Sequence, residues 1–195
     1  MDDGYVQLVK HQSKHANNVI VVFDGYENST KDHTHRRRKK HFCHDMKISQ
    51  QNSPHTSKEK FLSNSNNKTE LISKLSEALE MANVTTLCCR DDADTTIIRE
   101  CLQHSLIGTV EVRAEDADIL IKLVHHYDQE KHHIIIVTTL TGSYCVKEIV
   151  QSLTYEKRKY LLFCHSLLNV ILYLPSMGSA RRNCMQDLSL EILVL

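Results

Sequence analysis

Residues 108–126 read GTVEVRAEDADILIKLVHH, and this stretch decides the fold class. We expect residues 108–113 to form a strand, because β-branched residues recur along them. Residues 116–126 place apolar side chains on one face of a helix, at Ile119, Leu120, Leu123 and Val124. The acids of residues 115–118 lie at the expected start of that helix. A strand that leads directly into an acid-led helix is typical of an α/β protein.

The same pattern of strands and helices continues in both directions from this stretch. Upstream, we expect strands at residues 18–24 and 84–88 and helices at residues 68–81 and 91–103. Downstream, we expect a strand at 133–140, a turn at 141–143 into a short partner strand, and helices around 146–153 and 156–170. Strands that alternate with helices predict a mainly parallel central sheet flanked by helices.

The length of 195 residues fits one domain with a sizeable core better than two ordinary domains. We expect an N-terminal extension at residues 1–17, a single domain at 18–180 and a C-terminal tail at 181–195. Residues 27–66 are polar and are expected to form a basic insertion that is mobile or partly helical. The apolar residues 188–195 fit a last strand, a packing helix or an unrelated end.

The charge and the cysteine content limit the environments in which the protein is expected. The net charge is zero, but residues 31–41 are basic while acids gather at 91–94 and 115–118. No apolar stretch reaches the length of a membrane-spanning helix, and because Asp2 and Asp3 follow Met1 we expect no signal peptide. The seven cysteines lack CxxC spacing and fit the reduced thiols of a nuclear or cytoplasmic protein. We expect the pair Cys88-Cys89 to be buried.

Five aspartates follow predicted strands: Asp24, Asp92, Asp94, Asp116 and Asp118. Because ligands of such sheets bind beyond the carboxyl ends of the strands, we expect these acids to converge at one edge. Carboxylate oxygens are the ligands that Mg²⁺ prefers, and a two-metal site can hydrolyse a phosphodiester. The alternative is that the acids cap helices, which is the commoner role for any one pair.

Several short motifs together resemble a known family. They are VVFDGY at 21–26, STKD at 29–32, FLSN at 61–64, DADT at 92–95, EDADIL at 115–120 and FCHSL at 163–167. In this order and spacing, over roughly residues 18–180, they are similar to PIN-like domains of transposon-associated proteins in animals, distant relatives of the flap endonucleases. The resemblance implies a three-layer PIN-like α/β fold.

The resemblance also implies a function and a site. Carboxylates of this superfamily bind Mg²⁺ or Mn²⁺ and hydrolyse nucleic-acid phosphodiesters. By position, the catalytic and metal-binding residues would be Asp24, Asp92, Asp94, Asp116 and Asp118, with Glu115 beside them.

The chain departs from the family at two places. Where the family has Gly-Cys-Asp, this chain has Asn169-Val170-Ile171, so that Ile171 replaces an expected metal-binding acid. The Gly-Lys-Gly-like turn that follows is reduced to residues 177–180, MGSA. Two functions therefore stay open: a metal-dependent nuclease, and an inactive nucleic-acid-binding or scaffold domain derived from a mobile element. A protein-interaction domain without nucleic acid is a third alternative.

The basic segment provides candidate nucleic-acid contacts: Lys31, Arg36, Arg37, Arg38, Lys39 and Lys40. In the superfamily this region forms an arch over the site, and cations there would neutralise the phosphates of DNA or RNA. The alternatives are a nuclear-localisation signal and a solvated run of charge. A zinc site at His33, His35, His41, Cys43 and His44 is not favoured, because the second half of such a site is missing.

Overall fold

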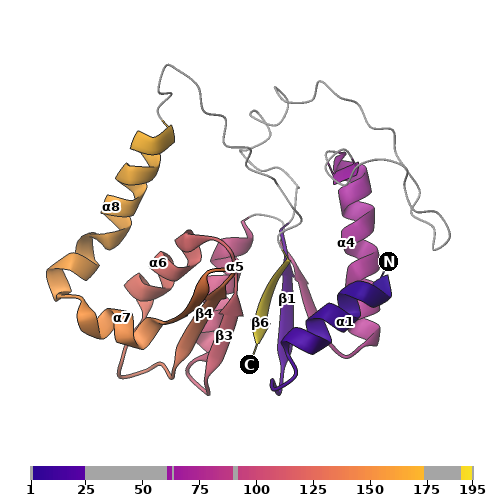
Figure 1. The fold of residues 1–195 in the computed structure, drawn as a ribbon, viewed down its shortest axis with the longest axis horizontal. Coiled ribbons are helices and arrows are strands. Elements are labelled where there is room, and N and C mark those ends of the chain that lie inside the picture. The colour runs from indigo at the N-terminus through magenta and orange to yellow at the C-terminus, as the bar shows by residue number, and fades with distance from the viewer. Residues whose placement is uncertain (1, 25–60, 63, 90–91, 174–189, 195) are drawn as a thin grey trace. The chain divides into compact units, whose positions relative to one another are not determined.

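The computed structural model describes residues 2–24, 61–62, 64–89, 92–173 and 190–194 (Figure 1). Contacts divide the chain into two compact units, one of Met1–Thr96 with Met185–Val194 and one of Ile97–Cys184 with Leu195. Helices and strands alternate in both units, so the predicted α/β class is confirmed. Within the described part of the chain, no helix has the length and apolar character needed to cross a membrane.

The first unit is built on strand β1 (Val19–Phe23). It pairs in parallel with β2 (Thr85–Cys88) and antiparallel with β6 (Leu190–Val194), which gives the order β2-β1-β6. The run from Ile20 to Phe23 is buried without interruption, as expected of a strand that is covered on both faces. Of the three alternatives for residues 188–195, the structure shows the last strand.

Two helices accompany these strands, and they pack against each other (Figure 1). Helix α4 (Ser65–Met81) confirms the predicted amphipathic helix and begins earlier than expected. It does so because the Asn64 side chain caps it by accepting the Asn66 N–H at 2.8 Å. Helix α1 (Asp2–Gln12) was not predicted, since residues 1–17 were expected to be an extension. Its Val9 is fully buried.

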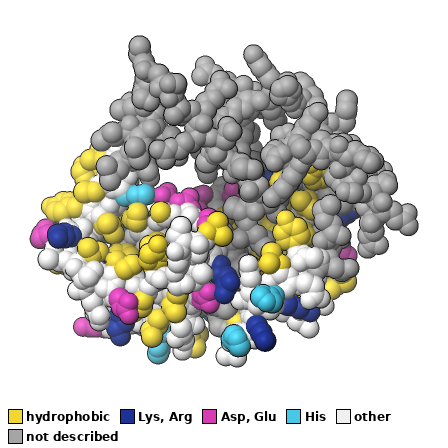
Figure 2. All heavy atoms as spheres, in the orientation of Figure 1, with side chains coloured by type: hydrophobic (Ala, Val, Ile, Leu, Met, Phe, Trp, Pro, Cys, Tyr) yellow, Lys and Arg dark blue, Asp and Glu magenta, His cyan; other side chains and the backbone are white. Residues whose placement is uncertain are grey.

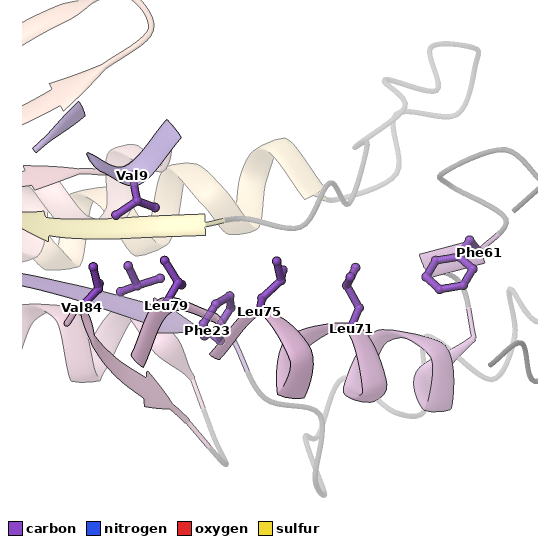
Figure 3. Close-up of a cluster of buried hydrophobic side chains, with 8 residues drawn as sticks. Val9, Phe23, Phe61, Leu71, Leu75, Leu79 and Val84 are labelled. Carbon is purple, nitrogen blue, oxygen red and sulfur yellow. The ribbon is translucent and has the colours of Figure 1, made fainter. Parts of the chain in front are cut away.

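The core of the first unit joins residues from five segments of the chain (Figure 3). Leu71, Leu75 and Leu79 recur every fourth residue along α4 and are all buried. They meet side chains of α1, β1 and the segments beside α4, namely Val9, Val21, Phe23, Phe61 and Val84. Burial of one such side chain stabilises the fold by about 1.5–3 kcal/mol.

Helix α4 ends in a left-handed residue. Asn83 has φ 61°, and its N–H donates to Glu80 O at 3.0 Å, while the Val84 N–H donates to Leu79 O at 3.0 Å. This pair of bonds is the Schellman arrangement, and it satisfies carbonyls that the end of a helix otherwise leaves open. Leu79 and Val84 also meet in the core, so the end of α4 is fixed by packing as well.

The second unit contains β3 (Val110–Arg113), β4 (Ile135–Thr139) and β5 (Gly142–Cys145) in that order. Its helices are α6 (Ala117–His126), α7 (Val146–Ser152) and α8 (Tyr155–Tyr173), and α6 packs against both others (Figure 1). Helix α5 (Ala93–His104) runs across the boundary between the units, with all turns from Ile97 onward in the second. All of these elements were predicted to within a few residues.

The strand pairing is mixed rather than mainly parallel, which corrects the expectation from the sequence. In each unit one described pair is parallel and one is antiparallel. The reason in the second unit is the short turn between Thr139 and Gly142, which pair with each other. A turn of this length can only reverse the chain, whereas a parallel pair needs a long crossover.

The expected burial of Cys88-Cys89 is wrong. Cys88 is exposed and Cys89 is half-buried. Strand β2 lies at the end of the order β2-β1-β6, and its residues are exposed or half-buried throughout. Among the cysteines that the structure describes, Cys101 on α5 is the buried one.

Candidate metal centre

Three of the predicted acids come together at the starts of two helices. Asp94 lies in the first turn of α5, Asp116 caps α6, and Asp118 lies in the first turn of α6. One carboxylate oxygen from each lies within 4.8 Å of those of the other two. Oxygens at this spacing can converge on a single divalent cation. These residues, called the acid group below, could therefore hold a metal ion.

The local fold explains why the two acids of α6 share one end of the helix. Asp116 has extended backbone angles, φ −85° and ψ 124°, and its side chain accepts the Asp118 N–H at 2.9 Å. The cap and the second residue of the helix are thereby held in one turn. The capping role and the gathering of acids, which the sequence presented as alternatives, occur together at Asp116.

Electrostatic interactions determine both the cost of the acid group in the fold and its affinity for a cation. Carboxylates this close repel one another. The N-termini of α5 and α6 offset part of that repulsion, because a helix carries partial positive charge at its start. Asp94 and Asp118 are half-buried and Asp116 is exposed, so the group is open to solvent and to a hydrated ion.

A histidine that the sequence did not single out contacts the acid group. His165 on α8 places Nε2 2.6 Å from Asp118 Oδ1. The His165 side chain is 20% exposed and that of Asp118 is 35% exposed, so the contact is partly shielded from water. His165 belongs to the FCHSL motif, but only the packing of α8 on α6 brings it to Asp118.

The acid group does not include Asp24, Asp92 or Glu115. Asp24 directly follows β1 and is half-buried, and Asp92 is exposed just before α5. Glu115 accepts the Leu140 N–H at 3.3 Å through Oε2, so it joins the turn after β4. The roles of Asp24 and Asp92 as ligands stay predictions.

Asp24 has a basic neighbour within the first unit. Burial lowers the pKa of Lys68 on α4, and the negative charge of Asp24 acts in the opposite direction. The Asp24 carboxylate therefore lies within electrostatic reach of the Lys68 ammonium. A cation bound at Asp24 would have to compete with this lysine.

The other predicted contacts lie outside the described residues. This applies to Lys31, to Arg36–Lys40, to residues 33–44, where a zinc site was considered, and to residues 177–180. Ile171 lies on α8, but its side chain belongs to the part that is not described. On the face in Figure 2, the Lys and Arg side chains of the described residues lie scattered rather than gathered into a basic patch. Contact with nucleic-acid phosphates therefore stays a prediction.

Comparison with known proteins adds no identity to this geometry. No protein-family model, no curated protein and no solved structure matches the chain.

Proposed function

We propose that the chain is a nuclease-type domain of three-layer PIN-like fold that uses Mg²⁺ or Mn²⁺ to hydrolyse nucleic-acid phosphodiesters. The observation that carries the proposal is the acid group, in which Asp94, Asp116 and Asp118 bring carboxylate oxygens within 4.8 Å of one another. The mixed α/β architecture agrees with it, as does the resemblance of residues 18–180 to the PIN-like domains.

The donor set fits these ions. Carboxylate oxygens are hard ligands, which suit Mg²⁺ and Mn²⁺ better than softer metals. In such a site the ion lowers the pKa of a bound water and stabilises charge on the leaving oxygen. The residues of this chain would hold the ion: Asp116 and Asp118 from one helix end, and Asp94 from another. Because all three sit in first turns or caps, their carbonyls accept the first hydrogen bonds of each helix, which hold this part of the backbone.

The number of bound ions follows from the remaining acids. A second ion would draw its ligands from Asp24 and Asp92, which are not members of the acid group. Ile171 replaces the acid that the family supplies to this cluster. We therefore expect one ion at the acid group.

A second candidate function is an inactive nucleic-acid-binding or scaffold domain derived from a mobile element. The observation that favours it is Ile171, because loss of one ligand can abolish catalysis while leaving binding. Both functions agree with a nuclear or cytoplasmic protein that contacts DNA or RNA.

The test of the metal centre is calorimetric titration with Mn²⁺. Asp116→Asn keeps a good N-cap for α6 but removes the charge, so the helix should form while Mn²⁺ affinity falls by about tenfold or more. Glu156→Gln is the matched control, because Glu156 is an exposed acid in the first turn of α8. Equal Mn²⁺ affinity of all three proteins would refute the centre.

The test of activity is incubation with labelled flap, single-stranded and duplex DNA and RNA in Mg²⁺ or Mn²⁺. Cleavage that Asp116→Asn abolishes supports the nuclease. Binding without cleavage, weakened by salt, supports the inactive domain. A protein that neither cleaves nor binds these substrates would contradict both functions and favour a protein-interaction domain.

Ile171→Asp tests whether the missing acid limits the site. If the rest of the family cluster is assembled, the variant should show a second Mn²⁺ binding event that the native protein lacks. An unchanged titration would mean that residue 171 does not complete a second metal site with the remaining acids.

A further inference from the structure

We propose that His165 is the positioning residue of the acid group: it holds one oxygen of Asp118, so that the other oxygen is presented to the cation. The inference rests on the proposed metal centre and assigns a role to a residue outside it. The resulting site would hold a hard divalent ion through a carboxylate that a histidine fixes in place.

The contact has the geometry of a strong hydrogen bond. His165 Nε2 and Asp118 Oδ1 are 2.6 Å apart, which is short even for a bond between a nitrogen donor and a carboxylate. Because an ionised carboxylate only accepts, Nε2 must carry the proton. Asp118 Oδ1 is therefore occupied by His165, and Oδ2 is the atom left to bind an ion.

The same distance argues against His165 as a direct ligand beside Oδ1. Two neighbouring ligand atoms of an octahedral Mg²⁺ or Mn²⁺ lie about 3 Å apart, since each is about 2.1 Å from the ion. The two atoms here are closer than that. His165 is also not a member of the group whose ligand atoms lie within 4.8 Å of one another. His165 thus acts on the ion through Asp118.

Asp118 is held at two points. Its N–H donates to Asp116 Oδ1 at 2.9 Å, which fixes the backbone, and its carboxylate is fixed by His165. A ligand held before the ion arrives loses less conformational freedom on binding. Partners of this kind around a metal site change its affinity by about 10- to 100-fold when they are removed.

Helices α8 and α6 are joined by Arg158 at one end of their shared length and, separately, by the His165–Asp118 bond at the other. Near the start of α8, the Arg158 side chain donates to Val124 O and His125 O at the end of α6, both at 3.0 Å. Two helical turns later, His165 meets Asp118 at the start of α6. Arg158 and His165 are about 10 Å apart along α8, and His125 and Asp118 are about 10 Å apart along α6. The antiparallel helices are thus in register at both ends.

The alternative is that the His165–Asp118 bond only links two helices. Substitutions of His165 separate this structural role from the positioning of a metal ligand. His165→Leu removes the donor, while His165→Gln keeps an N–H at nearly the same place. We expect Mn²⁺ affinity, measured calorimetrically below the melting temperature, to fall about 10- to 100-fold in His165→Leu. His165→Gln should recover most of it.

Arg158→Lys is the matched control, because it loosens the same pair of helices without touching the acid group. It should lower the melting temperature and leave Mn²⁺ affinity within about twofold. If His165→Leu behaves like Arg158→Lys, with lower stability and native affinity, His165 is only a tether and the inference fails.

Failure of the positioning role can be distinguished from failure of the proposed metal centre. Spin-echo spectroscopy of bound Mn²⁺ should show no nitrogen coupled to the ion; an imidazole coupling that disappears in His165→Leu would make His165 a ligand and overturn the positioning role. A native protein that binds no Mn²⁺ would instead overturn the proposed function, and the inference with it.

Discussion

Cys101 on α5 is fully buried, and burial raises the pKa of its thiol to about 12. Since the thiolate is the reactive form, this cysteine should resist alkylation while the protein is folded. We expect iodoacetamide at about pH 8 to modify the exposed Cys88 long before Cys101. Peptide mapping by mass spectrometry would follow both sites, and unfolding the protein in urea should remove the difference. Equal rates in the folded protein would contradict the burial of Cys101.

Asn83 is a second residue whose backbone dictates its identity. Its φ of 61° is left-handed, which glycine adopts freely, asparagine tolerates and alanine resists. Asn83→Ala should lower the free energy of unfolding by about 1 kcal/mol, and Asn83→Gly should change it by only a few tenths. Urea titration measures both. Met81→Ala, at an exposed position two residues away, is the control and should stay within about 0.5 kcal/mol.

The sequence predicted the acids of the site but not their partners, and the reason is sequence separation. Asp116 and Asp118 are two residues apart, so one helix start brings them together whatever the rest of the chain does. His165 reaches Asp118 only because α6 and α8 pack together. A motif that contains a histidine indicates nothing about which acid it meets. The same limit applies to Lys68, whose neighbour Asp24 lies far away in the sequence, directly after β1.

Among the helices and strands, the end of α6 depends most clearly on one side chain. Arg158 on α8 donates to Val124 O through Nε and to His125 O and Tyr127 O through Nη2. These carbonyls are among those that a helix end leaves without a partner. The guanidinium also places a positive charge at the negative end of the helix.

Arg158→Lys should lower the free energy of unfolding by about 1–3 kcal/mol, because an ammonium cannot serve these carbonyls in the same geometry. Thermal or urea unfolding measures the loss. Lys157→Ala, at an exposed neighbouring position, should change stability by less than about 0.5 kcal/mol. Equal effects of the two substitutions would show that the carbonyls find other partners, such as water.

Periodicity predicted most elements, because amphipathic helices and apolar strands carry their own pattern. Helix α4 was found from Leu71, Leu75 and Leu79, which are all buried as expected. Helix α1 was missed because residues 1–17 were expected to be an extension, although Tyr5, Val6 and Val9 lie against the core. Strand direction was misjudged because alternation of strands and helices says nothing about a terminal strand such as β6, which joins β1 antiparallel.

The stability of the whole molecule should fall in acid, through two groups of the second unit. Burial, together with the charges of His125 and Arg158, lowers the pKa of His126 from its usual 6.5. The Glu130 N–H and Lys131 lower the pKa of Asp128 from its usual 3.8. A lowered pKa in the folded state means that the unfolded chain binds the proton more readily.

The stability that each group contributes is fully present at pH values above the pKa of that group in the unfolded chain. It is lost as pH falls through the pKa of the group in the folded protein. For His126 the decline should begin below about pH 6.5, and for Asp128 below about pH 4. Melting temperature against pH should show both steps, and His126→Gln should remove the first and keep the second. A melting temperature that stays flat between about pH 7 and 5 would contradict the first step.

Strand β6 has a consequence for how the protein is made. It pairs Val194 with Val19, so β1 meets one of its two neighbours only after the ribosome has delivered every other described element. The second unit draws its helices and strands from one continuous segment and can condense on the nascent chain. The first unit must wait, with an edge of β1 open to chaperones or to other nascent chains until β6 has been synthesised.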